Sequence, residues 1–297
     1  MAACDWPPDV SRGANLPPEL SHPVRRRFRV VDEVVELQAP GHLHQVIDSL
    51  YADAPVSIAN TTLSVRIQID PVGFGINIDG EAAGHAENRA TLYEFLQREL
   101  TYALLDRLSP RFLLVHAGAV QIGTVCLLLP GNHDSGKSSL SYELGKHGKF
   151  YSDDVTPLHP ATRCAIPFER ELVLHAGTRT QHPGLPRPVD CAHFTDYDYL
   201  SARATGLCWA EPMVVSGLVF PQRATGSVAR IIDVPPAETA RRLLEQCFDL
   251  ERLGVGSVDA VADLATRPAV EAHFDRASDI MPALRAWAAD QDRIRQA

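Results

Sequence analysis

One segment of eight residues, 131–138, constrains the fold more than any other part of the chain. Its sequence, GNHDSGKS, fits the pattern of Gly, four variable residues, Gly, Lys and then Ser or Thr. It lies between an apolar run, residues 125–130, and a helical pattern that begins at Ser139. A strand, a glycine-bearing loop and a helix in this order direct backbone N–H groups and the positive end of a helix dipole at one point. The segment therefore predicts a polyphosphate-binding loop at the edge of an α/β sheet.

The residues of this segment are the candidates for nucleotide binding. Lys137 would reach the β- and γ-phosphates of a triphosphate, and the Ser138 hydroxyl would help to coordinate a Mg²⁺ ion that bridges them. An ordinary turn with a capping residue is the structural alternative. The candidate residues are Gly131, Asn132, His133, Asp134, Ser135, Gly136, Lys137, Ser138 and Ser139.

A pair of carboxylates, Asp153 and Asp154, follows Lys137 by 16 and 17 residues. A loop, a helix and a short strand fill this separation, which would return the pair to the sheet edge where the loop lies. Phosphoryl transfer to a hydroxyl needs a base for the proton and a carboxylate for the metal, so the two acids can divide these tasks. A simple Asp-Asp turn or a helix cap is the other interpretation.

Several motifs together resemble the HPr kinase/phosphorylase family, and more closely the HPr-kinase-related kinases of bacterial biosynthetic clusters. The motifs are LVHAGAV at 114–120, the strand at 125–129, the loop at 131–138 and YSDD at 151–154. The resemblance is strong over residues 111–175 and is one of pattern and order over 213–250. It implies an ATP- and Mg²⁺-dependent kinase that phosphorylates a serine hydroxyl, with a core similar to that of phosphoenolpyruvate carboxykinase.

The resemblance also implies roles for individual residues. His116 matches the family's histidine before the loop, Lys137 and Ser138 match its phosphate-binding lysine and metal-binding hydroxyl, Asp153 matches its general base, and Asp154 matches the neighbouring acid near the metal.

Two departures from the family are visible. Asp134 stands where the family loop usually has Gly, so that Mg²⁺ or His133 would have to offset an added negative charge. The long glycine-rich signature of HPr kinases proper has no counterpart between residues 163 and 226. The resemblance therefore does not extend to HPr as the acceptor, or to reverse phosphorolysis.

The chain is expected to divide near residue 110. Residues 1–23, which are rich in proline, would form a flexible arm, and residues 24–110 a small α+β lobe. Residues 111–297 would form the HPr-kinase-like P-loop catalytic domain, an α/β fold with a mixed or parallel sheet. Within it, residues 157–209 read as a lid-like insertion.

Hydrophobic periodicity predicts the elements of both parts. In the lobe we expect a strand over 28–37, a short helix with Leu43, Val46, Ile47 and Leu50 on one face, a hairpin of strands over 63–70 and 74–78, and a helix over 90–108. In the domain we expect a helix over 139–146, a strand over 214–221, a helix over 237–250 with Cys247 and Phe248 on its apolar face, and a final helix over 281–296.

The lid carries arginines that could bring positive charge to the transferred phosphoryl group: Arg163, Arg170, Arg179 and Arg187. Arg170 is the preferred catalytic candidate, because it follows the acid pair closely and resembles a basic position of the family. A surface arginine is the alternative.

Composition excludes several classes of function. The net charge of −9 argues against a nucleic-acid partner, and no segment is long and apolar enough for a signal peptide or a membrane span. The six cysteines show no Cys-x-x-Cys spacing, which favours a reducing cytoplasm, and the histidines show no zinc-binding spacing.

The acceptor stays open at this stage. The resemblance favours a serine of a small protein or peptide, and a small-molecule alcohol, amino acid or sugar is the first alternative. A nucleotide-gated binding module is an alternative of another class, because it would keep the loop but have no need of Asp153. A GTPase is disfavoured by the lack of an Asn-Lys-x-Asp segment. Homo-oligomerisation is implied by the resemblance alone.

Overall fold

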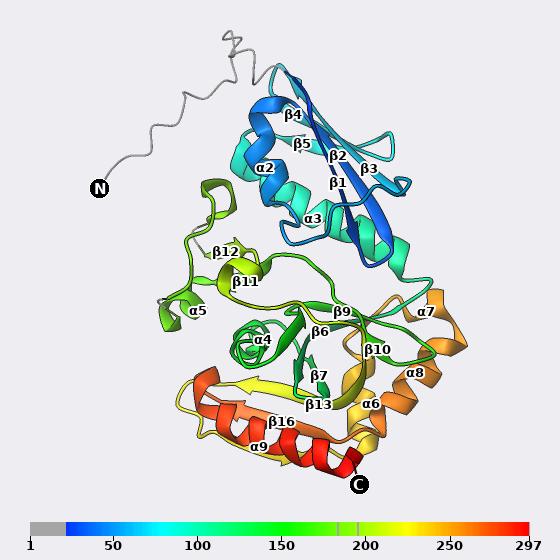
Figure 1. Cartoon of the computed structure of the whole chain (residues 1–297), viewed down its shortest axis with the longest axis vertical. Helices are drawn as coiled ribbons and strands as arrows, with labels where there is room; N and C mark the ends of the chain where they lie inside the picture. Colours follow the sequence, from blue (N-terminus) through cyan, green and yellow to red (C-terminus); the bar gives the residue numbers. More distant parts are fainter. Residues whose placement is uncertain (1–21, 183, 195, 297) are drawn as a thin grey trace. The chain divides into compact units, whose positions relative to one another are not determined.

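The computed structural model describes residues 22–182, 184–194 and 196–296, which form a mixed α/β protein with several sheets (Figure 1). The chain forms two compact units. Unit 1 comprises the described residues of Met1–Leu50, Ala54–Thr101 and Val189–Ala192, and unit 2 those of Tyr51–Asp53, Tyr102–Pro188 and His193–Ala297. Nearly all of the arm expected over residues 1–23 lies outside the described residues.

Unit 1 contains a five-stranded sheet in the order β1-β2-β3-β4-β5. Its strands are β1 (Val24–Val30), β2 (Glu33–Ala39), β3 (Leu63–Asp70), β4 (Gly73–Ile78) and β5 (Glu81–Ala86), and its helical segments are η1 (Gly41–Leu43), α2 (His44–Ser49) and α3 (Arg89–Leu108), whose last seven residues belong to unit 2. Strand β3 alternates between buried and exposed side chains as expected, and it pairs antiparallel with β4, which confirms the predicted hairpin.

The expected strand over 28–37 is wrong in one respect, because the chain forms two strands there. β1 and β2 pair antiparallel around a tight turn at Val31 and Asp32. Val31 adopts a φ of 57°, a left-handed conformation that β-branched residues rarely take. No glycine, asparagine or proline marks this turn, so the apolar run conceals it.

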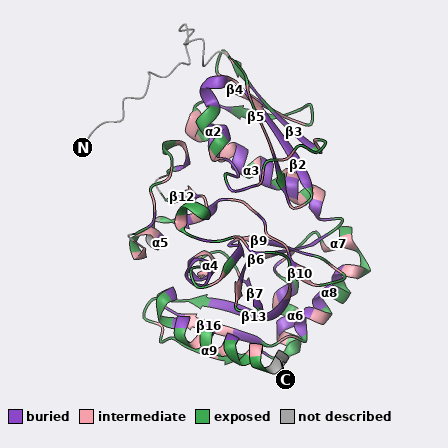
Figure 2. Ribbon diagram, in the orientation of Figure 1, coloured by how far each residue is buried: buried purple, intermediate pink, exposed green. Residues whose placement is uncertain are grey.

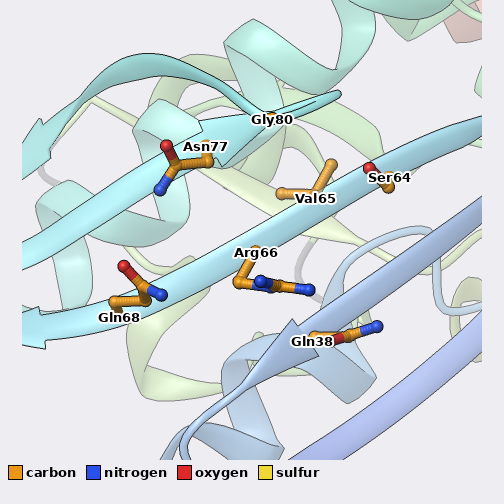
Figure 3. A pocket seen from close by; sticks show the side chains of 7 residues that line it. All are labelled: Gln38, Ser64, Val65, Arg66, Gln68, Asn77 and Gly80. Atoms are coloured by element: carbon orange, nitrogen blue, oxygen red, sulfur yellow. The ribbon is translucent and has the colours of Figure 1, made fainter.

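The polar face of this sheet carries a shallow hollow of about 250 Å³. Figure 3 shows the side chains that line it, which come from β2, β3, β4 and the turn after β4: Gln38, Ser64, Val65, Arg66, Gln68, Asn77 and Gly80. The lining is almost entirely polar, as is usual for the solvent-facing side of a sheet that is covered on one side only.

Unit 2 is built on a larger mixed sheet, in the order β10-β9-β6-β7-β13-β16-β14, with β8 and β15 also paired to β6. The strands are β6 (Leu113–Ile122), β7 (Val125–Pro130), β8 (Lys149–Ser152), β9 (Val155–Leu158), β10 (Cys164–Ala165), β13 (Met213–Arg223), β14 (Arg230–Asp233), β15 (Cys247–Phe248) and β16 (Ala269–Phe274). β7, β13 and β16 are parallel to one another, and the other pairings are antiparallel. Of the two alternatives expected, a mixed or a parallel sheet, the structure has the mixed one.

Helices cover both faces of the unit 2 sheet. Apolar residues of α4 (Lys137–Gly145) and α9 (Ala277–Gln296) pack with one side of β7 and β16. Those of α6 (Pro236–Leu244) and α8 (Val255–Ala265) pack with the other side of β7 and β13. The central strands are accordingly buried along most of their length (Figure 2).

The helix expected over 237–250 is too long. α6 ends at Leu244, and Cys247 and Phe248 form β15, which pairs with Val115 and Leu114 of β6. A short helix, α7 (Leu250–Leu253), follows. The apolar spacing continues past Leu244, but backbone pairing with a strand more than 130 residues earlier in the chain takes precedence over it.

The segment 157–209 is less irregular than expected. It contains β10, a two-stranded sheet of β11 (Leu172–His175) and β12 (Tyr197–Leu200), and the short helices α5 (Ala176–Gln181), η2 (Asp190–Ala192) and η3 (Arg203–Thr205). Its proline and glycine turns conceal these short elements, because none is long enough to show a period.

Gly118 of β6 lets α4 approach the sheet closely, and we expect Gly118→Ala to lower the free energy of unfolding by about 1–3 kcal/mol. A Cβ atom at Gly118 would lie 2.0 Å from Ser141 Oγ and 3.2 Å from Ser141 Cβ. Chemical denaturation measures the effect. The added substitution Ser141→Ala should recover part of the loss, because it removes the closer atom. If the double variant is instead less stable than Gly118→Ala alone, the inference that α4 lies close to Gly118 is wrong.

Candidate active site

The 131–138 loop joins β7 to α4, at the carboxyl end of a central parallel strand. Two of its residues take left-handed backbone conformations, Asp134 with a φ of 61° and Gly136 with a φ of 94°. Only glycine suits the second position, because a Cβ atom there would lie 2.8 Å from Cζ of Phe274. The helix begins at Lys137, two residues earlier than the sequence pattern suggests.

The loop curls around the Lys137 ammonium group. Lys137 is buried, and its Nζ donates hydrogen bonds to the carbonyl oxygens of Gly131, at 2.7 Å, and Asn132, at 2.9 Å. Burial lowers the pKa of Lys137, and the negative charges of Asp154, Asp153 and Asp134 oppose that change. The charge of Lys137 is therefore held at the centre of the loop, where an anion would meet it.

The structure brings the acid pair to this loop. Asp153 directly follows β8 and is 4% exposed. Its carboxylate accepts a hydrogen bond, at 3.4 Å, from the backbone N–H of Val173. Burial raises the pKa of Asp153 to about 6, with a contribution from the neighbouring Asp154, although the Arg170 charge, the Ser138 hydroxyl and the Val173 N–H act in the opposite direction.

Asp154 is more accessible and is surrounded by cationic or potentially cationic groups. Its two oxygens lie 3.2 Å from His116 Nε2 and 3.0 Å from Arg170 Nη2, and a third of its side chain is exposed. Partial burial would raise the pKa of Asp154, but the His116 hydrogen bond and the Arg170 and Lys137 charges together hold it well below its ordinary value. Asp154 thus remains an anion with an open side.

Gln246 is a site residue that the sequence interpretation missed. Its side-chain oxygen lies 3.1 Å from His116 Nδ1, its side-chain nitrogen donates to Asn132 Oδ1 at 2.8 Å, and its carbonyl accepts from the His116 backbone N–H at 2.7 Å. Gln246 therefore links the histidine beside Asp154 to the loop. The expected helix over 237–250 concealed it, because its position depends on β15.

The other predicted residues are placed as follows. Ser139 is buried and its hydroxyl lies 3.1 Å from Thr178 Oγ1, in contact with α5 rather than with the loop interior. His133 is exposed, with its ring centroid 5.2 Å from that of His116. The hydroxyl of Ser135 is buried and lacks a hydrogen-bond partner among the described residues.

Of the four lid arginines, only Arg170 lies at the acid pair. Arg163 forms an ion pair with Asp263 at 3.3 Å, Arg179 forms one with Asp198 at 2.7 Å, and Arg187 is exposed. The charges of Asp154 and Asp153 hold the pKa of Arg170 above its ordinary value, against the effect of its burial. Arg170 is therefore a permanent cation beside the two carboxylates.

The donor atoms fit a magnesium ion that is shared with a ligand. The Ser138 hydroxyl and the accessible Asp154 carboxylate supply oxygen, which Mg²⁺ prefers, and Mg²⁺ commonly combines one or two carboxylates with substrate phosphates. Within the part of the chain that the structure describes, no group of three or more His, Cys, Asp and Glu side chains could hold a metal alone. A cation here would need oxygens from a bound anion.

Asp153→Asn should stabilise the fold at about pH 8 and change its stability little at about pH 4. Because folding raises the pKa of Asp153 from 3.8 to about 6, the folded state retains a proton that the unfolded chain loses between these values. The loss of stability caused by the buried Asp153 charge is therefore absent at low pH and reaches its full value above the higher pKa. We expect a gain of about 1–3 kcal/mol at about pH 8, measured by urea unfolding at both pH values. An equal effect at both would contradict the burial of this charge.

Among the described residues, no helix is both long and apolar enough to cross a lipid bilayer. No protein-family model matches the sequence, and no curated protein matches it significantly.

Proposed function

We propose that the protein is a Mg²⁺-dependent kinase that transfers the γ-phosphoryl group of ATP to a hydroxyl group. The observation that carries this proposal is the hydrogen-bonded path from Asn132 of the loop through Gln246 and His116 to Asp154, which joins the lysine-bearing loop to the acid pair. An anion-binding loop and two carboxylates at one point are what phosphoryl transfer to a hydroxyl requires.

Each group then has a task. The loop amides and Lys137 hold the phosphates, and Ser138 and Asp154 hold Mg²⁺, which when bound neutralises charge on the phosphate oxygens. The oxygen of the acceptor hydroxyl forms a bond to the γ-phosphorus, and Asp153 accepts the proton of that hydroxyl. The bond between the γ-phosphorus and the ADP oxygen breaks. The raised pKa of Asp153 suits a base that works near neutral pH.

His116, Arg170 and Gln246 support this arrangement. Arg170 offsets the mutual repulsion of the two carboxylates, and His116 orients Asp154 from its other oxygen. Gln246 fixes the His116 ring because its side-chain oxygen accepts a hydrogen bond from Nδ1 of the ring, and so it acts as a positioning residue.

We place the core of unit 2 with the HPr-kinase-like P-loop kinases, in agreement with the sequence resemblance, and we place the protein in the cytoplasm. The acceptor in this proposal is a serine of a small protein or peptide, with a small-molecule alcohol as the alternative. A binding module gated by nucleotide is less well supported, because it gives no reason to keep Asp153 charged, buried and next to Ser138.

The test is phosphoryl transfer by the full chain from γ-labelled ATP, with and without Mg²⁺, to an array of serine-containing peptides and to water. We expect Mg²⁺-dependent binding of ATP, slow release of phosphate in the absence of an acceptor, and transfer of the label to a subset of peptides. Failure to bind ATP in the presence of Mg²⁺ would overturn the proposal. Binding without any release or transfer of phosphate would instead favour the binding module.

A further inference from the structure

A second cavity opens against the first half of the 131–138 loop. It has a volume of about 440 Å³, within the range of about 300–1,000 Å³ that is common for ligand sites. Its walls are the start of the loop, the end of β13 and the second half of α6: Pro130, Gly131, Asn132, His133, Asp134, Ser135, Phe220, Pro221, Gln222, Arg241, Arg242, Glu245 and Gln246. Neither Lys137, Ser138, Asp153 nor Asp154 lines it.

The cavity lies at the carboxyl ends of two adjacent parallel strands. β7 ends at Pro130 and β13 runs beside it in the same direction, with Leu128 opposite Leu218. In open α/β sheets ligands bind at this edge, because loops diverge there and leave a crevice. Residues 131–135 of the loop line this cavity, and Lys137 follows two residues later, so one extended ligand can reach both the cavity and Lys137.

The charges around the cavity are already balanced within the protein. Arg241 donates to Glu238 at 2.7 and 2.8 Å and also pairs with Glu245, while Arg242 donates to Glu238 at 2.6 Å and to Glu271 at 2.8 Å. The hydrogen bonds from the two arginines lower the pKa of Glu238 to about 2, so that it stays anionic. The cavity therefore has little excess positive charge with which to attract a second anionic group.

The rest of the lining suits a planar, uncharged and polar group. Phe220 and Pro221 give an apolar floor, and the Arg242 guanidinium lies 5.4 Å above the Phe220 ring. Gln222 is exposed and its amide can donate and accept hydrogen bonds, whereas the Gln246 amide, already bonded to His116 and Asn132, keeps one N–H and one oxygen lone pair. Arg241 is 56% exposed, and its flat guanidinium can stack on an aromatic ring.

We propose that this cavity binds the nucleoside part of the phosphoryl donor, with the base next to Gln222 and Arg241 and the polyphosphate passing along the loop toward Lys137. The inference rests on the proposed function, because it assumes that the loop holds a nucleoside triphosphate. It adds that the protein distinguishes a nucleotide from a bare polyphosphate.

The test compares ATP with inorganic tripolyphosphate, each with Mg²⁺, by calorimetry on the full chain. Gln222 is exposed, so Gln222→Trp can fill the cavity without disturbing the core. We expect this variant to weaken ATP binding about tenfold or more and to leave tripolyphosphate binding unchanged. Val258→Trp, on the exposed face of α8 away from the cavity, is the matched control and should change neither.

The possible outcomes separate the two proposals. If neither ATP nor tripolyphosphate binds, the loop is not a phosphate site and the proposed function fails. If ATP and tripolyphosphate bind equally well and Gln222→Trp weakens neither, the loop stands but the nucleoside site is wrong. If Gln222→Trp leaves ATP binding intact and abolishes transfer to a serine peptide, the cavity binds the acceptor, and the nucleoside assignment is also wrong.

Discussion

Lys137→Ala is expected to abolish Mg²⁺-ATP binding at millimolar nucleotide and to reduce phosphoryl transfer by about 10²–10³-fold or more. The ammonium group sits inside the loop, bonded to the carbonyl oxygens of Gly131 and Asn132. A phosphate group would replace these two neutral carbonyl acceptors with anionic oxygens, which attract the ammonium group more strongly. No other lysine or arginine contacts these two carbonyls among the described residues, so no neighbouring cation can replace the lost charge. Calorimetry measures the binding, and release of labelled phosphate measures the transfer.

Lys149→Ala is the matched control for this prediction. It removes the same charge from an exposed position on β8, close in the sequence to Lys137 but outside the loop. ATP binding by Lys149→Ala should stay within about threefold of that of the parent protein. If Lys137→Ala binds Mg²⁺-ATP as tightly as Lys149→Ala does, the loop has no part in nucleotide binding.

The local part of the site could be predicted from the sequence, because it is encoded in short segments. The order of β7, the loop and α4 needs only neighbouring residues, and one helix and one short strand bring the chain back to Asp153. The alternation of buried and exposed side chains in β3 could be predicted for the same reason. The parallel direction of β7 and β13 is also expected, because apolar strands separated by helices allow few topologies.

The parts that could not be predicted depend on contacts between distant segments. Gln246 reaches His116 only because β15 pairs with β6, and the periodicity of α6 gives no sign that the helix stops. The sequence favoured Arg170 among the lid arginines because it follows the acid pair closely, but it could not show that Arg163 and Arg179 already pair with other acids. Ser139 shows the same limit, since its hydroxyl is directed at Thr178 by the packing of α4.

Asp153→Asn is expected to reduce phosphoryl transfer by about 10²–10⁴-fold while Mg²⁺-ATP affinity stays within about threefold. The asparagine oxygen can still accept the hydrogen bond from the Val173 backbone, so the site keeps its geometry, but the amide cannot take a proton from the acceptor. Asp154→Asn should behave differently and weaken the Mg²⁺-dependent part of ATP binding, because the accessible anion next to His116, which would help to hold the ion, is lost. Binding and single-turnover transfer, measured separately on both variants, distinguish the two roles.

Asp53→Asn controls for the loss of a buried carboxylate elsewhere in unit 2. Asp53 is buried and accepts hydrogen bonds from Ser201, the Arg203 backbone and Trp209, none of which touches the acid pair. This variant should lose stability and keep its rate of transfer, whereas Asp153→Asn should gain stability at about pH 8 and lose its rate. Because stability and rate change in opposite ways in the two variants, the comparison separates a catalytic role from a structural one. Unfolding cannot explain a slow enzyme that is more stable than its parent. An Asp153→Asn protein that still releases phosphate at the parent rate would show that another group, or water, takes the proton.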